Sequence, residues 1–365
     1  MGPSVSRFRK SPPTVESAKA NAPSALSQPS PLAAASPHPR ESFTSTPDAS
    51  SPDVDVHLVT SISGADFTRQ YHGVEDSEYF LPSDIGEQDR LELQHYLLRH
   101  VFKGDVIRKD IREFLETPGR KILDIGCANG WWLDSVGKVY LSAQLYGVDL
   151  APNVVEAATK FLPHANFSVG NVLTGLPYPD DTFDFVHQRL LFLGLPKQQF
   201  HLAVRELIRV TKPGGWIELV EADAQPYRAG PLVETIVGAF HAVMAPKQLD
   251  FLAGTNLANY IKLAIQKSGQ KGATRIARAR HLERRTVSMP YNWGGPIGDM
   301  VGQNFKQAYN NMEDILHKQL GLERAEYRKL VEDAIEESKE FKMFGNTHCV
   351  SFQVEKSLSL EINKK

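Results

Sequence analysis

A carboxylate stands just before a glycine-rich turn in the stretch LDIGCANG, where Asp124 precedes Gly126, Ala128 and Gly130. The apolar residues before it are typical of a buried strand, and the glycines are typical of a turn from that strand into a helix. Most loops of this kind hold phosphate groups on bare backbone amides. A carboxylate at this position would repel a phosphate, so the stretch favours a ligand that carries positive charge.

Two ligands fit a strand, loop and helix of this kind. A dinucleotide needs the pattern G-x-G-x-x-G with a small third residue, but Trp131 occupies that third position and Asp124 adds negative charge. S-adenosylmethionine carries an adenosine, an ammonium, a carboxylate and a positive sulfonium. Asp124 can then face a cation while the backbone amides of the loop face the carboxylate. We therefore predict that S-adenosylmethionine is the cofactor.

Polar residues also follow the next two predicted strands. Asp149 ends the second strand beside Leu150, and its carboxylate can accept both ribose hydroxyls, as in dinucleotide enzymes. Asn171 follows the third strand, where its oxygen can accept from the adenine amino group and the amide of Val172 can meet a ring nitrogen. A single such residue would indicate only a hydrogen bond within a local turn. Three polar residues at the ends of successive strands predict an adenosine site.

The elements that must position these residues alternate along the chain. We expect strands at 121–126, 143–150, 165–171, 182–188 and 216–222, with helices at 152–162 and 197–215. Such alternation is typical of a parallel sheet covered by helices on both faces, an α/β fold. It brings the predicted cofactor residues to the carboxyl ends of the strands, where ligands bind in such sheets.

Further elements flank this core. Helices are expected at 83–104, 231–244, 256–267 and 326–341, and the last two strands at 285–291 and 347–354. Asp84 and Glu87 resemble a capping box at the first helix. Tyr327, Leu330, Val331, Ala334, Ile335 and Phe341 mark one buried stripe on the last helix. The boundaries predicted from these elements are a cap at 64–118, a core at 119–225, a helical lid at 228–280 and a completion of the sheet at 281–365.

The amino-terminal 60 residues differ from the rest of the chain. They are rich in Ser, Pro and Ala and poor in large apolar residues, so we expect a disordered tail. The 365 residues carry 41 basic and 43 acidic side chains, which gives no global signal for nucleic acid. Two cysteines make a disulfide framework or a Cys-based zinc site improbable, and we expect no metal. Because no apolar run is long enough for a bilayer, we expect a cytoplasmic or nuclear protein without a membrane partner.

Four motifs together resemble class I S-adenosylmethionine-dependent methyltransferases: LDIGCANG, GVDLAPN, LPYPDDTFDFV and RELIRVTKPGGWIELVE. The segment 71–102 is similar to fungal methyltransferases related to the velvet-complex regulator of secondary metabolism. The resemblance spans 71–354 and implies a Rossmann-like sheet of seven strands, a helical amino-terminal segment and a helical insertion after the fifth strand. It also implies that Tyr71 helps to wall the cofactor. Ala128 stands where Gly is usual and Asn171 where Asp is usual, and both leave a usable site.

Methyl transfer needs two positioned reactants and the exclusion of water, and it needs a base only for some acceptors. At the end of the fourth strand, His187 is the candidate general base and Arg189 a candidate substrate contact. The alternative is that His187 packs or orients Arg189. Glu221 and His348 are further substrate candidates. Phe240, in the predicted lid, is expected to line the acceptor site, with core packing as the alternative.

Two functions remain open from the sequence. One is an enzyme that methylates an oxygen or nitrogen atom of a small metabolite. The other is a velvet-type regulatory protein with a regulatory protein partner and weak or protein-directed activity. The basic run TRIARARHLERRT favours a solvated edge of the sheet over an RNA contact, because the domain as a whole is not basic.

Overall fold

The computed structural model describes residues 85–268 and 275–358 of the chain. The predicted tail, Tyr71 and the capping residue Asp84 lie outside these residues. The described residues belong to one compact unit. Within this part of the chain, no helix is long and apolar enough to cross a membrane.

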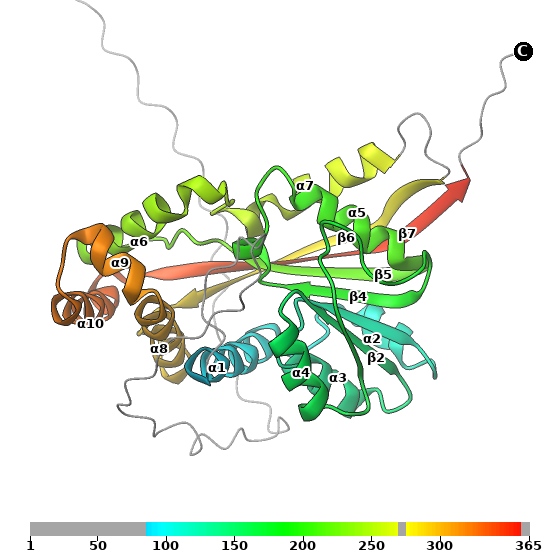
Figure 1. Cartoon of the computed structure of the whole chain (residues 1–365), viewed down its shortest axis with the longest axis horizontal. Coiled ribbons are helices and arrows are strands. Elements are labelled where there is room, and N and C mark those ends of the chain that lie inside the picture. The colour runs from blue at the N-terminus through cyan, green and yellow to red at the C-terminus, as the bar shows by residue number, and fades with distance from the viewer. Residues whose placement is uncertain (1–84, 269–274, 359–365) are drawn as a thin grey trace, which may run out of the picture. The chain divides into compact units, whose positions relative to one another are not determined.

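Seven strands form one sheet in the order β3-β2-β1-β4-β5-β7-β6 (Figure 1). Their bounds are β1 Lys121–Ile125, β2 Gln144–Asp149, β3 Asn166–Val169, β4 Phe183–Arg189, β5 Thr211–Ala222, β6 Arg275–Pro290 and β7 Phe344–Leu358. The first five strands pair in parallel, and β7 runs antiparallel between β5 and β6. This confirms the predicted α/β sheet, and it puts the carboxyl ends of β1, β2 and β4 at one rim.

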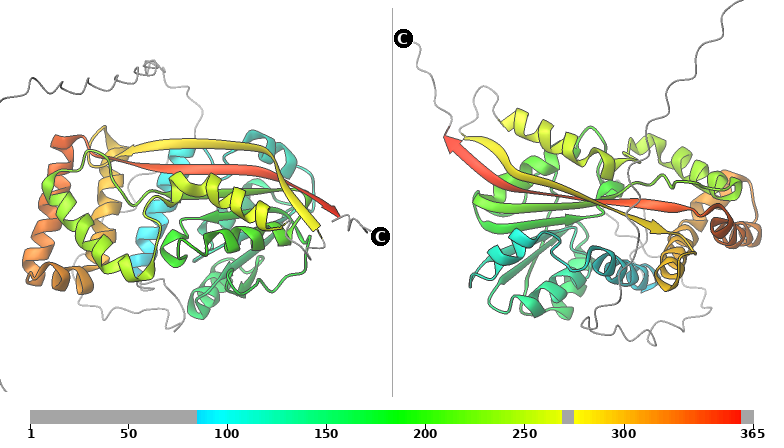
Figure 2. Two further views of the ribbon diagram at one scale, coloured as in Figure 1. Left: turned by 90° about the horizontal axis from the view of Figure 1, so that it is seen from above. Right: turned by 180° about the vertical axis from the view of Figure 1, so that it is seen from behind.

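Each face of the sheet is covered by helices whose apolar residues complete a core. On one face lie α2 (Lys109–Leu115), α3 (Trp131–Val139) and α4 (Pro152–Phe161), and on the other lie α5 (Phe200–Val210) and α7 (Ala253–Ser268) (Figure 2). The prediction that α7 belongs to a lid is wrong. Its apolar face, with Leu257, Tyr260, Ile261 and Ala264, is buried in the core of the sheet, where the ring of Tyr260 stacks on Phe200.

A second core forms between helices beyond the end of the sheet. These are α6 (Pro231–Met244), α8 (Pro296–Asn311), α9 (Glu313–Leu320) and α10 (Arg324–Phe341), and α1 (Ile85–Phe102) packs along α8. The stripe predicted on α10 is buried at Tyr327, Val331, Ala334 and Ile335, whereas Phe341 is 40% exposed. The segment predicted only to complete the sheet therefore does more, because α8 and α9 add a helical wall that was not predicted.

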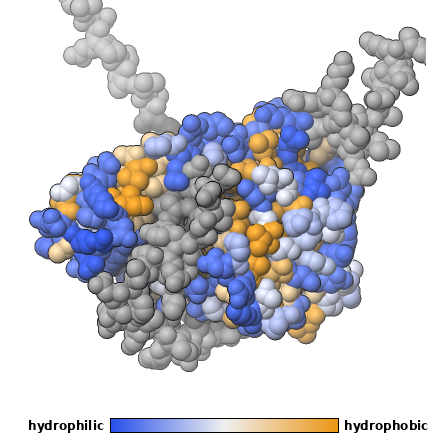
Figure 3. Space-filling model, in the orientation of Figure 1, coloured by the Kyte–Doolittle hydropathy of each residue, from blue (hydrophilic) through white to orange (hydrophobic). Residues whose placement is uncertain are grey.

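Strand pairing extends three strands beyond their predicted bounds. Thr211 already belongs to β5, so α5 ends earlier than predicted; β6 begins at Arg275, and β7 spans Phe344–Leu358 rather than 347–354. The basic run therefore lies on β6, the outermost strand, which confirms the predicted edge position. Among the residues coloured in Figure 3, hydrophilic ones predominate and hydrophobic ones form a few patches.

Candidate functional site

A cavity of about 410 Å³ opens at the carboxyl ends of the strands. Its lining has two parts, which we name the loop half and the helical half. The loop half comprises Asp124–Asn129, Asp149–Ala151, Gly170–Val172 and Arg189–Leu195. The helical half comprises residues of α1, α6 and α8 together with Met289, Tyr291 and Met312. This volume falls in the range of small-molecule sites, roughly 300–1,000 Å³.

The loop half takes its shape from left-handed backbone at Gly126 (φ 67°), Ala128 (φ 46°) and Gly130 (φ 84°). At Gly126 a Cβ atom would lie 2.8 Å from Leu191 Cδ1, so a side chain there would push into the lining of the cavity. Ala128 has to adopt a conformation that favours glycine, and its amide donates to Asp149 Oδ2 over 3.1 Å. Gly130 lies at the N-cap of α3 and, unlike Gly126 and Ala128, is not among the residues that line the cavity.

Asp149 holds the loop in place from the end of β2. Its Oδ1 accepts from the amide of Ala151 over 3.0 Å, and its Oδ2 accepts from Ala128. Burial raises the pKa of this carboxyl, and the three backbone amides of Ala151, Ala128 and Leu150 act against the rise. Each carboxylate oxygen offers two lone pairs, so the group can hold the loop and still accept from ribose hydroxyls.

Asn171, Val172 and Leu150 also line the cavity, as the sequence predicted for an adenosine site. The side-chain oxygen of Asn171 accepts from the amide of Leu173 over 2.9 Å, which closes a local turn. This bond is the local turn contact that a single such residue would indicate. A second lone pair remains on the oxygen, so the contact with adenine stays a prediction.

Asp124 lines the cavity from the end of β1, whereas His187 lies beneath it. His187 Nδ1 is 2.8 Å from Asp124 Oδ1, and its ring stacks on Trp132 with centroids 3.9 Å apart. Burial lowers the pKa of His187, and the carboxylate of Asp124 acts against this shift. Only 1% of His187 is exposed and it does not line the cavity. The structure therefore does not support a general base here, and His187 orients Asp124 rather than Arg189.

Two other predicted substrate residues are also enclosed by their neighbours. The carboxylate of Glu221 accepts from the amides of Leu191 and Phe192 and from the side chain of Gln188. His348 Nε2 lies 3.1 Å from Asp223 Oδ2. Neither lines the cavity. Both are buried among these partners, so the structure does not place either residue at the cavity.

The buried carboxyl of Glu221 predicts how stability depends on pH. Burial raises its pKa to about 8, against the effect of its hydrogen bonds. A raised pKa adds stability that is complete below the unfolded value, about 4.5, and that is lost as the pH rises through 8. We expect the free energy of unfolding to fall between pH 5 and pH 9, as measured by urea unfolding.

Glu221→Gln imitates the protonated carboxyl and should flatten this dependence. Near pH 5 the variant should match the unaltered protein, and at pH 9 it should be the more stable of the two. Glu218, whose pKa burial raises to about 7, is left unchanged in the variant and accounts for the slope that remains. Parallel profiles for the two proteins would rule out Glu221 as the source.

Arg189 and Phe240, the other two predicted substrate residues, both line the cavity. The ring of Phe240 also packs against Phe251 and Tyr309, with centroids 5.7 and 6.2 Å away, and only 4% of the residue is exposed. Phe240 is therefore both a core residue and a wall of the cavity.

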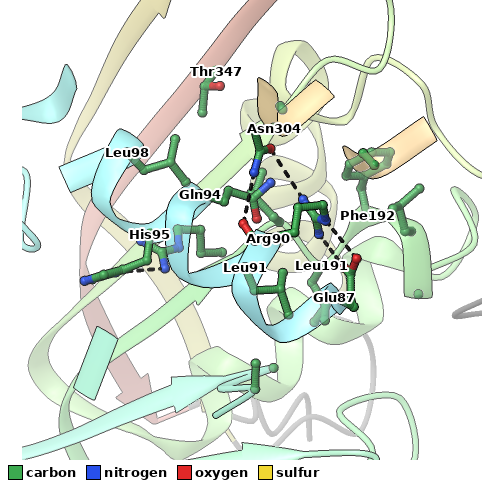
Figure 4. A pocket seen from close by; sticks show the side chains of 18 of the residues that line it. Glu87, Arg90, Leu91, Gln94, His95, Leu98, Leu191, Phe192, Asn304 and Thr347 are labelled. Carbon is green, nitrogen blue, oxygen red and sulfur yellow. Dashed lines mark hydrogen bonds and ion pairs between the residues drawn. The ribbon is translucent and has the colours of Figure 1, made fainter. Parts of the chain in front are cut away.

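The sequence prediction missed most of the helical half. In Figure 4, α1 presents Glu87, Arg90, Leu91, Gln94, His95 and Leu98, and α8 presents Asn304. Arg90 Nε donates to Glu87 Oε2 over 2.8 Å, and Asn304 Nδ2 donates to the carbonyl of Arg90 over 2.9 Å. The first bond lies within α1, and the second joins α1 to α8. The sequence signal available for this wall was a helical spacing after Pro296, where apolar residues follow one another at intervals of four, four and three positions: Val301, Phe305, Tyr309 and Met312.

Comparisons with known proteins agree with this geometry. Residues 122–215 match the methyltransferase domain family. The N-methyltransferase gliN of Aspergillus fumigatus is 25% identical over 246 residues, which are 65% of this chain and 82% of that protein. The secondary metabolism regulator laeA of Coprinopsis cinerea is 30% identical over 165 residues, 44% of this chain and 40% of that protein.

A solved structure was also compared. Phosphoethanolamine N-methyltransferase 2 of Haemonchus contortus, in complex with S-adenosyl-L-methionine, is 12% identical with a TM-score of 0.41. The match covers 72% of this chain and 57% of that chain.

The sheet order, the glycine loop and the family match define a class I S-adenosylmethionine-dependent methyltransferase. Its cofactor is S-adenosylmethionine. Within that class, the chain is related to the fungal laeA-type proteins and to fungal N-methyltransferases. The residues present suit the cofactor, since carboxylates at the ends of β1 and β2 flank a loop with small side chains at positions 126 and 128.

Proposed function

We propose that the protein transfers the methyl group to a nitrogen atom of a small, largely apolar metabolite, which binds in the helical half of the cavity. The loop half holds the cofactor, and the helical half opens from it without a break. The helical half is lined mainly by apolar and aromatic side chains: Leu98, Phe240, Met289, Tyr291, Val301, Phe305, Tyr309 and Met312. Such walls suit a ring or an alkyl chain and exclude water from the reacting atoms.

The observation that favours nitrogen is the state of the ionisable groups around the cavity. Asp124, Asp149 and Asp223 are each bonded to protein donors, and Glu87 is ion-paired with Arg90. Burial, together with Arg189, Arg99 and His187, lowers the pKa of His95 to about 2, so this imidazole is a poor base. A hydroxyl acceptor would need a base to take its proton as the bond forms. A neutral amine attacks with its own lone pair and loses its proton afterwards.

The relationship to the N-methyltransferase gliN supports the same acceptor atom. The test is to incubate the purified protein with S-adenosylmethionine carrying a labelled methyl group and a metabolite extract. Mass spectrometry then identifies the product that gains the label, and NMR assigns the methylated atom. A small-molecule N-methyl product is expected. A product methylated on oxygen, or label found only in protein, would contradict the proposal.

Phe305→Ala tests the helical half as the acceptor site. Phe305 lines the cavity and packs on Tyr309 and Tyr291, with centroids 4.4 and 5.1 Å away, but it is only partly buried. Removing the ring should change the acceptor KM at least tenfold and admit bulkier acceptors, while the Kd of S-adenosylmethionine stays within about threefold. Phe341→Ala, at an exposed site on α10, is the matched control. Acceptor kinetics equal to those of the control would place the acceptor elsewhere.

A second candidate function is regulatory, with methyl transfer directed at a protein. The relationship to the secondary metabolism regulator laeA favours it. In the same labelling experiment, this function predicts label in a protein band rather than in a metabolite. It also predicts that Phe305→Ala leaves the labelling unchanged, because a protein acceptor is too large for the cavity.

A further inference from the structure

Arg189 is a cation at the edge of the cavity, and no described carboxylate forms an ion pair with it. It is the last residue of β4 and lies directly after Gln188, which pairs with Ile125 of β1. Among the residues that the structure describes, its guanidinium has one hydrogen-bond partner, His95 Nδ1 at 3.3 Å, and no ion pair. Burial lowers its pKa, and Asp124 and Asp105 act against this shift. Arginine nevertheless keeps its charge in proteins, so a charge in this partly buried position favours an anionic ligand.

His95 orients this guanidinium without neutralising it. Its Nδ1 accepts from Arg189, and its Nε2 lies 2.9 Å from Ser135 Oγ. Nδ1 can accept only when the ring proton is on Nε2, and the low pKa of His95 keeps the ring neutral. A carboxylate in place of His95 would cancel the charge of Arg189. A neutral imidazole fixes the direction of the Arg189 guanidinium, whose positive charge stays available to a ligand.

The neighbouring strand presents the opposite charge. Asp124, at the end of β1, also lines the cavity, and its Oδ1 is held by His187. The ends of β1 and β4 thus offer a carboxylate and a guanidinium side by side at the mouth of the glycine loop. A ligand that carries an ammonium and a carboxylate on one carbon atom satisfies both groups.

We propose that Arg189, oriented by His95, binds the α-carboxylate of S-adenosylmethionine while Asp124 faces its ammonium. Arg189 is then a cofactor-binding residue rather than a substrate contact, and His95 is a positioning residue. A planar guanidinium can donate two parallel hydrogen bonds to a carboxylate. This inference depends on the cofactor and not on the acceptor proposed above.

The test compares S-adenosylmethionine with its decarboxylated form, which keeps the adenosine, the sulfonium and the amine. Calorimetry on the unaltered protein should give at least tenfold weaker binding of the decarboxylated form, since hydrogen bonds to charged groups contribute about 1.5–3 kcal/mol. Arg189→Gln should weaken the binding of S-adenosylmethionine by a similar factor. The same variant should change the affinity for the decarboxylated form less than threefold. Arg99→Gln is the control, because Arg99 also contacts Ser135 but does not line the cavity.

Substitutions at His95 distinguish a role in positioning Arg189 from a role in packing alone. His95→Asp introduces a carboxylate beside Arg189 and should weaken the binding of S-adenosylmethionine tenfold. His95→Asn keeps a neutral hydrogen-bond acceptor, so its Kd for S-adenosylmethionine should stay within about threefold of that of the unaltered protein. Three results would overturn the inference: no preference of the unaltered protein for the carboxylated cofactor, equal weakening of both cofactors by Arg189→Gln, or an effect of Arg189→Gln on the acceptor KM alone. The first measurement needs no variant, so the inference can be tested even if a variant fails to fold.

Discussion

Replacing Asp149 by alanine is expected to weaken the binding of S-adenosylmethionine at least a hundredfold. The carboxylate bonds the amides of Ala128 and Ala151 and faces the predicted position of the ribose. The substitution therefore removes the predicted ribose contacts and also releases the loop. Each hydrogen bond to a charged group contributes about 1.5–3 kcal/mol. Calorimetry with S-adenosylmethionine and with its demethylated product measures the loss.

The control for this variant is Asp134→Ala on α3, where the carboxylate bonds only Lys138 among the described residues. It should leave the affinity unchanged. NAD should bind to none of these proteins. Full affinity in Asp149→Ala, or measurable binding of NAD, would contradict the site as assigned.

Replacing Phe240 by alanine should have the largest effect on stability of the changes considered. The residue is 4% exposed, and its ring lies between Phe251, Tyr309 and His241. Removing a buried phenylalanine typically costs about 3–5 kcal/mol. Chemical unfolding should show a loss of this size, and acceptor use should change as well because the ring also lines the cavity.

Phe240→Leu serves as the companion variant, since it keeps most of the buried volume. It should recover most of the stability and retain an altered acceptor preference. If Phe240→Leu instead restores both stability and preference, Phe240 acts on acceptors only through the packing of α6. A loss of less than about 1 kcal/mol in Phe240→Ala would show that the second core does not depend on this ring.

The cofactor half of the site could be predicted because its signals are local. Asp124 and Asp149 lie at the ends of recognisable strands and Gly126 directly follows one, and a parallel sheet brings such ends together. His187 and Glu221 were misplaced because the end of a strand is visible in the sequence, whereas the face to which a side chain points in a fully buried strand is not. All residues of β4 up to Gln188 are buried, so no alternation of polar and apolar residues marks the two faces.

The helical half was harder to predict because it depends on long-range packing. An amphipathic helix such as α7 can cover a sheet or a cavity equally well, and only its partner α5 decides between them. The contact between α1 and α8 joins Arg90 to Asn304 across 214 positions. Nothing in either segment alone indicates the other.

The two halves of the cavity also differ in how the chain supplies them. The loop half comes from one continuous length, residues 124–195, whereas the helical half is collected from α1, α6 and α8, which lie on both sides of it in the sequence. Changes in α6 and α8 can therefore accumulate without disturbing the strand ends, or the His95–Arg189 contact from α1, that hold the cofactor. A chimaera that keeps 85–225 and takes α6 and α8 from a relative should exchange the acceptor while retaining the affinity for S-adenosylmethionine. The fold thus allows one methyl-donor module to be inherited while its acceptors diversify.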